Sequence, residues 1–344
     1  MILFIKKIIK NFLKLICIPF VIIILILNLF IKLKFIRFNP SRIGHLSFDS
    51  EFYLRKKKYD NLILFASYSN KNICNVFMDK MIKRQFIFSN LFNLLHAANK
   101  LISDNNSIFV ETAHHTNPDY TFAPSRNLIN GPTQLKFTDN ESQEGINFLN
   151  KVNPKKKKLI TIIVRDSAYL PNLDYHNYRD CDINNMIKPI EYLIEKDFFV
   201  IRMGKIVHNH ITINSEYFLD YPFSDYRSDF LDIWLMGNSY LTISTGTGLE
   251  NISDIFNKNY LHLNMTPFMN YNSWSKKYLF APKLFLNSNS KEKINFSKLI
   301  EIGAINFSST QEYIEKDIVM CEIDPNNMIK IIDEKIKRIE NQWE

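Results

Sequence analysis

The sequence has few of the residues that build common cofactor and metal motifs. Its 344 residues include only 8 glycines, which form neither the Gly-x-Gly-x-x-Gly of a dinucleotide-binding turn nor the Gly-Lys-Ser/Thr of a P-loop. The four cysteines, Cys17, Cys74, Cys181 and Cys321, contain no Cys-x-x-Cys pair. This spacing argues against a zinc site and against a disulfide framework. A dinucleotide-dependent oxidoreductase is therefore disfavoured.

The composition is that of a folded α/β protein. Hydrophobic residues make up 46% of the chain and aromatic residues 14%, enough for a large core. The length beyond the apolar N-terminal segment suits two α/β domains or one large one. The formal charge is +8, and many of the lysines lie beside an apolar run, an arrangement that favours anionic lipid head groups. The chain has no recognisable nucleic-acid-binding module, so we expect no nucleic-acid partner.

The N-terminal segment predicts a hydrophobic membrane helix. Residues 15–31 read LICIPFVIIILILNLFI, and only Pro19 and Asn28 interrupt the apolar run. With its flanks the run is just long enough to cross a bilayer, but an in-plane anchor remains an alternative. A cleaved signal peptide is disfavoured because no small-x-small site follows. We expect residues 1–33 to anchor the protein, with the rest of the chain on the cytoplasmic side of the membrane.

The rest of the chain predicts two Rossmann-like domains with a boundary near residue 150. In residues 34–150, strands are expected at 34–38, 61–67 and 107–112, with loops at 39–51 and 116–140. Residues 151–344 alternate more clearly, with strands at 159–166, 198–204, 240–244 and 260–264 and a final helix over 326–341. Strands that alternate with helices predict right-handed crossovers and doubly wound parallel sheets.

The most specific local pattern is the run Ser244-Thr245-Gly246-Thr247-Gly248 between a strand and a helix. Glycines let the backbone approach an anion, and a following helix N-terminus offers free N–H groups. The hydroxyl groups add donors for phosphate oxygens. The turn lies at the carboxyl end of a strand, where open α/β sheets bind ligands. A plain tight turn is the alternative.

Two strands are expected to end in arginine at the same edge. Arg202 and Gly204 close the strand at 198–204, and Arg165 closes the strand at 159–166. Arginine pairs bidentately with phosphate, so these residues and the glycine turn predict one shared anion site. For each arginine, pairing with a carboxylate is the alternative.

Two further patterns carry candidate catalytic groups. In Tyr178-Arg179-Asp180-Cys181-Asp182, the two aspartates match the DxD of metal-dependent glycosyltransferases, although Asp182 also suits a helix cap. His45 follows Gly44 after the first strand, and its pKa range suits a general base for an acceptor hydroxyl. Asp49 and Glu51 are nearby alternatives, and a structural role for His45 stays open. His114 and His115 are interpreted as loop residues.

An ordered set of these segments resembles one known family. RIGHLSFDSEFYL, YRDCDI, VIRMG, SDFLDIWL and TISTGTGL, spread over roughly residues 37–270, are similar to a family of bacterial glycosyltransferases associated with surface-polysaccharide gene clusters. The resemblance implies a GT-B-like architecture, in which two Rossmann-like domains face a cleft and the C-terminal one holds the donor. It also implies metal-independent catalysis. Family members more often carry serine where Thr247 stands, which keeps the hydroxyl.

Together these patterns predict a membrane-attached glycosyltransferase that uses a nucleotide-sugar donor and a glycan or lipid-linked acceptor. His45 and Asp180 are the candidate catalytic residues. The candidate donor-binding residues are Arg165, Tyr178, Arg179, Arg202, Gly204, Ser244, Thr245, Gly246, Thr247 and Gly248. We expect no metal and no cofactor. The alternatives are a DxD-type metal-dependent glycosyltransferase and a non-catalytic, membrane-anchored glycan-binding or scaffold protein.

Overall fold

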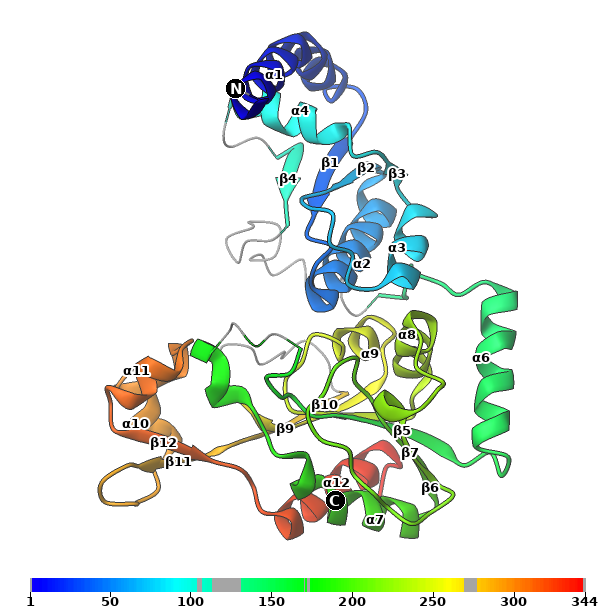
Figure 1. The fold of residues 1–344 in the computed structure, drawn as a ribbon, viewed down its shortest axis with the longest axis vertical. Coiled ribbons are helices and arrows are strands. Elements are labelled where there is room, and N and C mark those ends of the chain that lie inside the picture. The colour runs from blue at the N-terminus through cyan, green and yellow to red at the C-terminus, as the bar shows by residue number, and fades with distance from the viewer. Residues whose placement is uncertain are drawn as a thin grey trace. The chain divides into compact units, whose positions relative to one another are not determined.

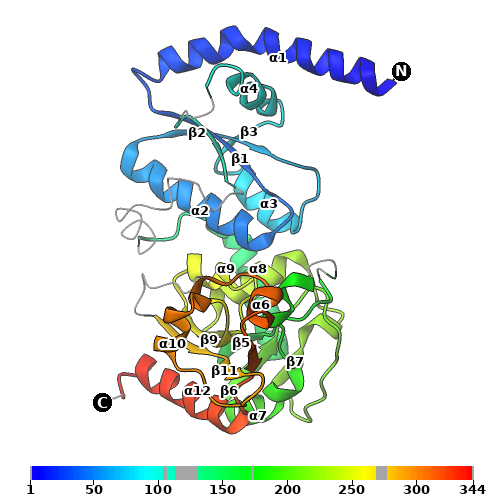
Figure 2. The same cartoon turned by 90° about the vertical axis from the view of Figure 1, so that its left-hand side faces the viewer.

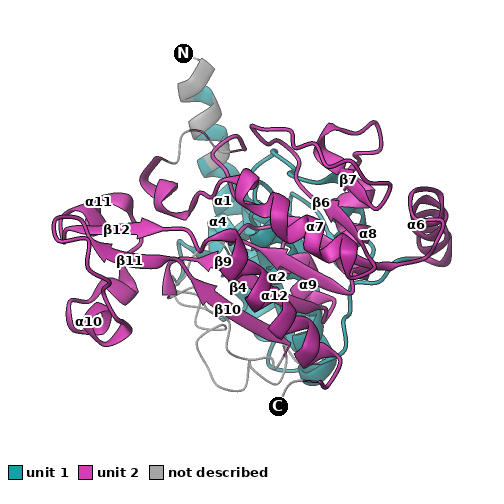
Figure 3. Cartoon of the chain, turned by 90° about the horizontal axis from the view of Figure 1, so that it is seen from below, with its two compact units in different colours: residues 1–137 teal, residues 138–344 magenta. Residues whose placement is uncertain are grey.

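The structure is a computed structural model that describes residues 2–103, 107–112, 131–169, 171, 174–268 and 277–342. Its contacts divide the chain into two compact units, Met1–Phe137 and Thr138–Glu344 (Figure 3). The division falls before helix α6 (Asp139–Val152), whereas the sequence pattern places it near residue 150, after that helix. Each unit contains its own parallel sheet, as expected for an α/β protein with two Rossmann-like parts.

Unit 1 contains a four-stranded sheet in the order β3-β2-β1-β4 (Figure 1). All of its strands run parallel: β1 (Leu33–Phe38), β2 (Ile63–Tyr68), β3 (Ile87–Phe88) and β4 (Phe109–Glu111). Helices α2 (Ile43–Asp60), α3 (Val76–Lys83) and α4 (Phe92–Asn99) accompany them. Phe35 stacks on Phe65 at 4.5 Å and on Phe109 at 4.9 Å between ring centroids. These aromatic contacts across neighbouring strands hold the sheet together.

Helix α2 corrects the loop expected over residues 39–51, because it begins at Ile43. Its polar residues do not indicate a loop, since they are buried and bonded within the unit. The hydroxyls of Ser47 and Ser50 donate to the carbonyls of Ile43 (2.8 Å) and Leu46 (2.7 Å). Because α2 buries apolar and polar residues together, its sequence lacks the helical periodicity by which a helix is recognised.

The hydrophobic N-terminal segment forms a helix, α1 (Ile2–Leu27), but the membrane-spanning character predicted for it is not supported. One side of α1 packs on α4 (Figures 1 and 2). The side chain of Val21 is fully buried. Among the described residues, no helix combines the length with the apolarity that crossing a membrane requires.

Unit 2 contains a six-stranded parallel sheet in the order β10-β9-β8-β5-β6-β7. Its strands are β5 (Lys158–Ile163), β6 (Phe198–Arg202), β7 (Phe218–Asp220), β8 (Leu241–Ser244), β9 (Asn259–Met265) and β10 (Tyr278–Pro282). Helices α7 (Ile187–Glu195) and α12 (Pro325–Ile339) pack on one face. Helices α8 (Asp229–Asn238) and α9 (Asn251–Ile255) lie on the other (Figure 1). The doubly wound sheet predicted for this part of the chain is therefore confirmed.

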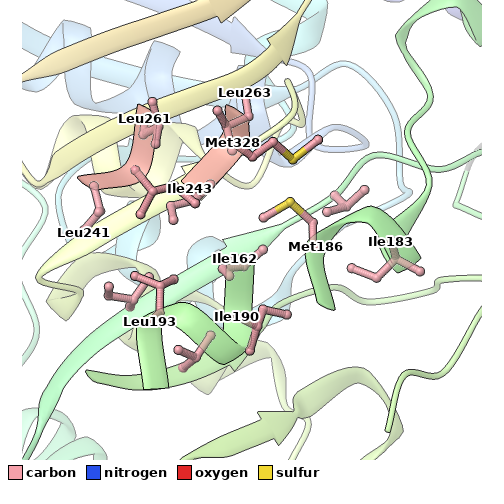
Figure 4. Close-up of a cluster of buried hydrophobic side chains, with 14 of the residues drawn as sticks. Ile162, Ile183, Met186, Ile190, Leu193, Leu241, Ile243, Leu261, Leu263 and Met328 are labelled. Atoms are coloured by element: carbon pink, nitrogen blue, oxygen red, sulfur yellow. The ribbon is translucent and has the colours of Figure 1, made fainter. Parts of the chain in front are cut away.

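The main core of unit 2 lies between the sheet and the helices α7 and α12. Ile162, Ile243 and Leu261 project from neighbouring strands toward Ile190 and Met328 (Figure 4). These side chains are fully buried. Each such side chain contributes about 1.5–3 kcal/mol relative to an exposed one, so this layer fixes the positions of the strand ends.

A small subdomain at the side of this sheet is absent from the sequence predictions. It pairs β11 (Leu284–Asn287) antiparallel with β12 (Ile318–Cys321) and adds α10 (Phe296–Glu301) and α11 (Thr310–Ile314). Its core contains Phe285, Leu299 and Tyr313 together with Tyr178 from the 3-10 helix η2 (Asp174–Arg179). The subdomain therefore fixes the segment that carries Arg179 and Asp180.

Candidate functional site

The glycine turn follows β8 at the carboxyl end of the sheet, between the ends of β5 and β9. Gly246 has φ +94°, a left-handed conformation that favours glycine. A Cβ atom at Gly246 would lie 3.2 Å from the sulfur of Met265 and 3.5 Å from Nη2 of Arg179. Glycine is therefore required here both for the backbone conformation and for the close approach of Arg179.

Glu250, which the sequence interpretation did not single out, holds the turn from inside. One of its carboxylate oxygens accepts hydrogen bonds from the Ser244 hydroxyl and from the Thr247 backbone N–H, the latter at 2.7 Å. The backbone N–H of Gly246 in turn donates to Ser244 Oγ at 3.1 Å. The Ser244 hydroxyl and these two N–H groups were expected to face a phosphate, but the structure uses them inside the turn.

The carboxylate of Glu250 has a second buried partner, His262 on β9, whose Nε2 lies 3.1 Å from the other carboxylate oxygen. Burial alone would raise the pKa of Glu250. The attraction of His262 and the hydrogen bonds from His262 and Ser244 outweigh this effect and lower the pKa. Glu250 is therefore ionised at neutral pH and acts as a fixed acceptor for the turn.

The two threonines of the turn differ in what they contact. Thr245 is buried, and its Oγ1 accepts the backbone N–H of Arg165 at 2.8 Å, which ties β8 to the end of β5. The hydroxyl of Thr247 is also buried, but it has no hydrogen-bond partner among the residues that the structure describes. Gly248 is exposed. Thr247 and Gly248 are thus the predicted turn residues that remain available to a ligand.

Arg165, Arg179 and Asp180 lie together beside this turn, as the sequence predicts for three of its candidates. Arg179 donates from Nη2 to the carbonyl of Gly246 at 2.8 Å, while its buried Nε has no partner within the described ranges. Arg165 Nε lies 3.3 Å from Asp180 Oδ1. The Cys181 N–H donates to the carbonyl of Arg165 at 3.0 Å. These contacts place two guanidinium groups at the carboxyl edge of the sheet.

The charges at this edge favour an anion. Burial and the neighbouring charge of Arg179 lower the pKa of Arg165, and burial raises the pKa of Asp180 although Arg165 lies close. Lys283 adds a buried cation that donates to the carbonyls of Tyr178 (3.0 Å) and Asp180 (2.5 Å). Three cations therefore face two carboxylates, Asp180 and its neighbour Asp166. An added anion would relieve the repulsion between the two arginines.

Arg202 differs from its expected role as a donor-binding residue. Its side chain is 1% exposed. It pairs with Asp220 at 3.2 Å and donates to the carbonyl of Asn209 at 2.5 Å. Strand β7 pairs with β6 in a register that places Asp220 directly beside Arg202. Gly204 lies against Val207 and Pro222, so both residues serve the packing of this corner.

Tyr178 also differs from its expected position in the site. Its buried ring lies 5.1 Å from the ring of Tyr313 in the core of the small subdomain. The DxD interpretation is not supported either, because the Asp182 side chain accepts the N–H of Asn184 (2.9 Å) at the start of a 3-10 helix and Asp180 pairs with Arg165. Within the described ranges, no group of three or more His, Cys, Asp or Glu residues could hold a metal ion.

His45, the candidate base, lies in the first turn of α2 in unit 1 and is half-buried. Its catalytic role stays a prediction. Of the nearby alternatives, Glu51 has a structural role, since it pairs with Arg55 at 2.6 Å and accepts the N–H groups of Gln134 (2.7 Å) and Leu135 (2.8 Å). Burial raises the pKa of Glu51. His114 and His115 lie outside the described residues.

Comparison with known proteins gives a result at the level of the fold only. No model of a known protein family matches the sequence, and no curated protein has a similar sequence. Among solved structures, a glycosyl transferase of family 9 from Veillonella parvula superposes with a TM-score of 0.51 and 8% identity, over 89% of this chain and 97% of that chain.

Two heptosyltransferases give weaker superpositions. ADP-heptose lipopolysaccharide heptosyltransferase II of E. coli has a TM-score of 0.44 and 11% identity, over 89% of this chain and 99% of that chain. TibC of enterotoxigenic E. coli, solved with ADP-D-beta-D-heptose, has a TM-score of 0.43 and 11% identity, over 90% and 77%. The likeness to the Veillonella structure shows that the chain has a GT-B-like fold with two parallel sheets.

Proposed function

We propose that this protein is a glycosyltransferase that moves a sugar from a nucleotide-activated donor to a glycan or lipid-linked acceptor in cell-surface polysaccharide synthesis. One observation carries the proposal: Arg165 and Arg179 contact the glycine turn at the carboxyl edge of a parallel sheet. In the described part of the chain, the same turn carries the buried hydroxyl of Thr247, which has no hydrogen-bond partner. This edge is where open α/β sheets bind ligands. The GT-B-like fold supports the same conclusion by analogy only.

The arrangement suits a diphosphate leaving group. Arg179 is held on the glycine turn through Gly246 and keeps its Nε for a ligand. Arg165 is oriented by Asp180, and Thr247 supplies a hydroxyl donor. As the bond to the sugar breaks, negative charge grows on the diphosphate, and groups that are already oriented stabilise that charge without rearranging. Asp180 therefore acts in this proposal by positioning Arg165.

The acceptor needs a base to remove the proton from its attacking hydroxyl. We assign this role to His45, because imidazole titrates near neutral pH and accepts a proton at its unprotonated nitrogen. Two guanidinium groups and a hydroxyl account for the charge on the leaving group, so the proposal needs no divalent metal. The catalytic part would lie on the cytoplasmic side of a membrane, where nucleotide sugars are made, with α1 as its membrane contact.

A thermal-shift screen tests the donor site directly. UDP-, GDP-, CMP- and dTDP-sugars and ADP-heptose are added to the purified protein with and without EDTA. A donor that binds only the folded state raises the melting temperature, and we expect one nucleotide class to do so equally in both conditions. If none of these compounds shifts the melting temperature, the donor site is absent and a non-catalytic scaffold is favoured.

Replacing Arg179 tests whether this residue binds the donor. Loss of a hydrogen bond between charged groups costs about 1.5–3 kcal/mol, so Arg179→Ala is expected to weaken donor binding by about ten- to a hundredfold in calorimetry. Arg338→Ala removes an exposed arginine of α12 that pairs with Glu334 on the same helix, and it serves as the matched control. Equal donor affinity in the two variants would contradict the proposed anion site.

A further inference from the structure

The outer side of α1 is a continuous apolar surface. The row includes Ile5, Ile9, Phe12, Ile16, Ile23 and Ile26, all of them exposed although they are large and hydrophobic. Their spacing follows one face of a helix. The helix is 26 residues long, which corresponds to about 39 Å, so the row forms one long stripe. Soluble proteins rarely expose a contiguous apolar surface of this extent unless it binds something.

The inner side of α1 fixes the direction of this stripe. Val21 is fully buried, and Cys17, Ile18 and Ile24 are half-buried on the same side. This side packs on α4, which itself contacts β1 and β2 (Figures 1 and 2). Because α1 lies on its own unit along one side, its opposite side points away from the fold. The helix that carries the apolar stripe is therefore packed against the rest of unit 1 and is not an isolated helix.

The charge around the stripe is of one sign. The first acidic residue of the chain is Asp49, whereas the residues before it include Lys6, Lys7, Lys10 and Lys14. A basic segment that carries an apolar face is attracted to anionic head groups, while its apolar side chains enter the acyl region. Pairing the stripe with a second copy would instead bring two segments of the same positive charge together.

We propose that α1 docks in the plane of an anionic lipid surface, with its outer stripe in the boundary between head groups and acyl chains. This inference rests on the membrane association proposed above, and it names the surface and the orientation responsible. The contact with α4 keeps the helix parallel to the body of unit 1, so the stripe meets the membrane along its whole length. The protein then stays at the membrane face, where a lipid-linked acceptor would be found.

Vesicle flotation tests the proposed partner. The full chain is floated with vesicles of phosphatidylcholine and phosphatidylglycerol, and with phosphatidylcholine alone. Three serines on the stripe, Phe12→Ser, Ile16→Ser and Ile23→Ser, are expected to lower binding by about tenfold or more. The matched control carries Val76→Ser, Phe296→Ser and Ile314→Ser, which change exposed apolar residues of α3, α10 and α11. Equal binding of the two triple variants would overturn the proposal.

The contribution of lipid charge to vesicle binding is measured separately. We expect tighter binding to the anionic vesicles than to neutral ones, and a difference that shrinks as salt is added. Replacing Lys6, Lys7 and Lys10 with glutamine should reduce binding to the anionic vesicles toward the neutral level. A protein that forms dimers in lipid-free buffer through the stripe and ignores both vesicles would overturn the choice of lipid as the partner.

Fluorescence quenching tests the orientation. Phe12→Trp, Ile16→Trp and Ile23→Trp are compared with the parent protein on vesicles whose lipids carry bromine either near the head group or near the chain end. An in-plane helix predicts that all three tryptophans are quenched mainly by the shallow bromine. Deep quenching of Ile16→Trp alone would indicate insertion across the bilayer and would overturn the in-plane geometry. None of these measurements needs a sugar donor, so they test the membrane-docking proposal independently of the sugar-transfer proposal.

Discussion

Glu250 and Arg179 hold the same glycine turn from different sides. Arg179 donates to the carbonyl of Gly246, and Glu250 accepts from Ser244 and Thr247. The carboxylate therefore orients the turn without facing a ligand, and the guanidinium lies between the turn and the proposed anion. We expect substitutions of the two residues to affect different properties of the protein.

Glu250→Gln should lower stability in a pH-dependent way. The pKa of Glu250 is lowered in the folded protein, so its contribution is fully present above its ordinary value of 4.5 and is lost as pH falls through the folded pKa. At pH 7 the loss of the ionised acceptor should reduce the free energy of unfolding by about 1–3 kcal/mol. Urea denaturation of both proteins measures this difference, which should shrink on acidification below the ordinary value.

The control for this prediction is Glu334→Gln, which removes a partly exposed carboxylate that pairs with Arg338 within α12. Surface changes of this kind stay within about 0.5 kcal/mol. A stability difference between Glu250→Gln and the wild type that does not vary with pH would contradict the ionised state assigned to Glu250.

Arg202 should matter for stability and not for donor binding. Its substitution by methionine leaves Asp220 buried without its cation, and breaking a buried ion pair in this way costs about 3–5 kcal/mol. The double variant Arg202→Met with Asp220→Asn should recover part of that loss, because the stranded charge is removed. Chemical denaturation measures stability, and calorimetry measures donor affinity in the folded proteins. Weaker donor binding at unchanged stability would instead restore the phosphate-binding interpretation of Arg202.

Among the elements, the strands of unit 2 were the most predictable. The runs at 159–166, 198–204, 240–244 and 260–264 match β5, β6, β8 and β9 because buried parallel strands are short, β-branched and bounded by polar residues. The N-terminal half of helix α2 was assigned to a loop because it buries Ser47, Ser50 and Glu51 among apolar residues. The strands β11 and β12 were missed because four residues carry too little periodicity to be recognised.

The part of the candidate site that lies at the ends of the parallel strands could be predicted from the sequence. Arg165 and Thr245 meet because parallel strands bring their carboxyl ends to one edge. The partner of a buried charge is set by contacts between distant segments, which no local pattern contains. Lys283 bonds to Tyr178 across 105 residues, and Asp220 reaches Arg202 from the next strand of the sheet. The only local signal for Glu250 was an acidic residue directly after the turn.

The turn between β8 and α9 is the element on which the donor site depends most. Gly246→Ala would add a Cβ atom 3.2 Å from Met265 at a left-handed φ of +94°. The backbone strain costs about 1–2 kcal/mol, and the displaced turn should also move Arg179. We expect donor affinity measured by calorimetry to fall more than stability does. Gly303→Ala also has a left-handed φ but no atom within 4 Å of its Cβ, and it is the matched control for strain alone.

At the scale of the whole molecule, the proposed roles divide between the two units. Every residue assigned to the donor lies in residues 138–344, whereas His45 and the apolar stripe of α1 lie before Phe137. Unit 2 also has its own sheet and its own buried core. The division at Thr138 keeps the capping box of α6 intact, since Thr138 and Glu141 bond each other's backbone N–H groups. The C-terminal unit is therefore a candidate for independent folding.

We expect a protein that consists of residues 138–344 to fold, to bind the donor as tightly as the full chain does, and to transfer no sugar. It should also fail to float with anionic vesicles, because it lacks α1. Calorimetry, a transfer assay and flotation measure these three properties separately. Retained transfer would remove His45 from the mechanism and return the role of the base to Asp180, whereas lost donor binding in a folded fragment would mean that unit 1 completes the donor site.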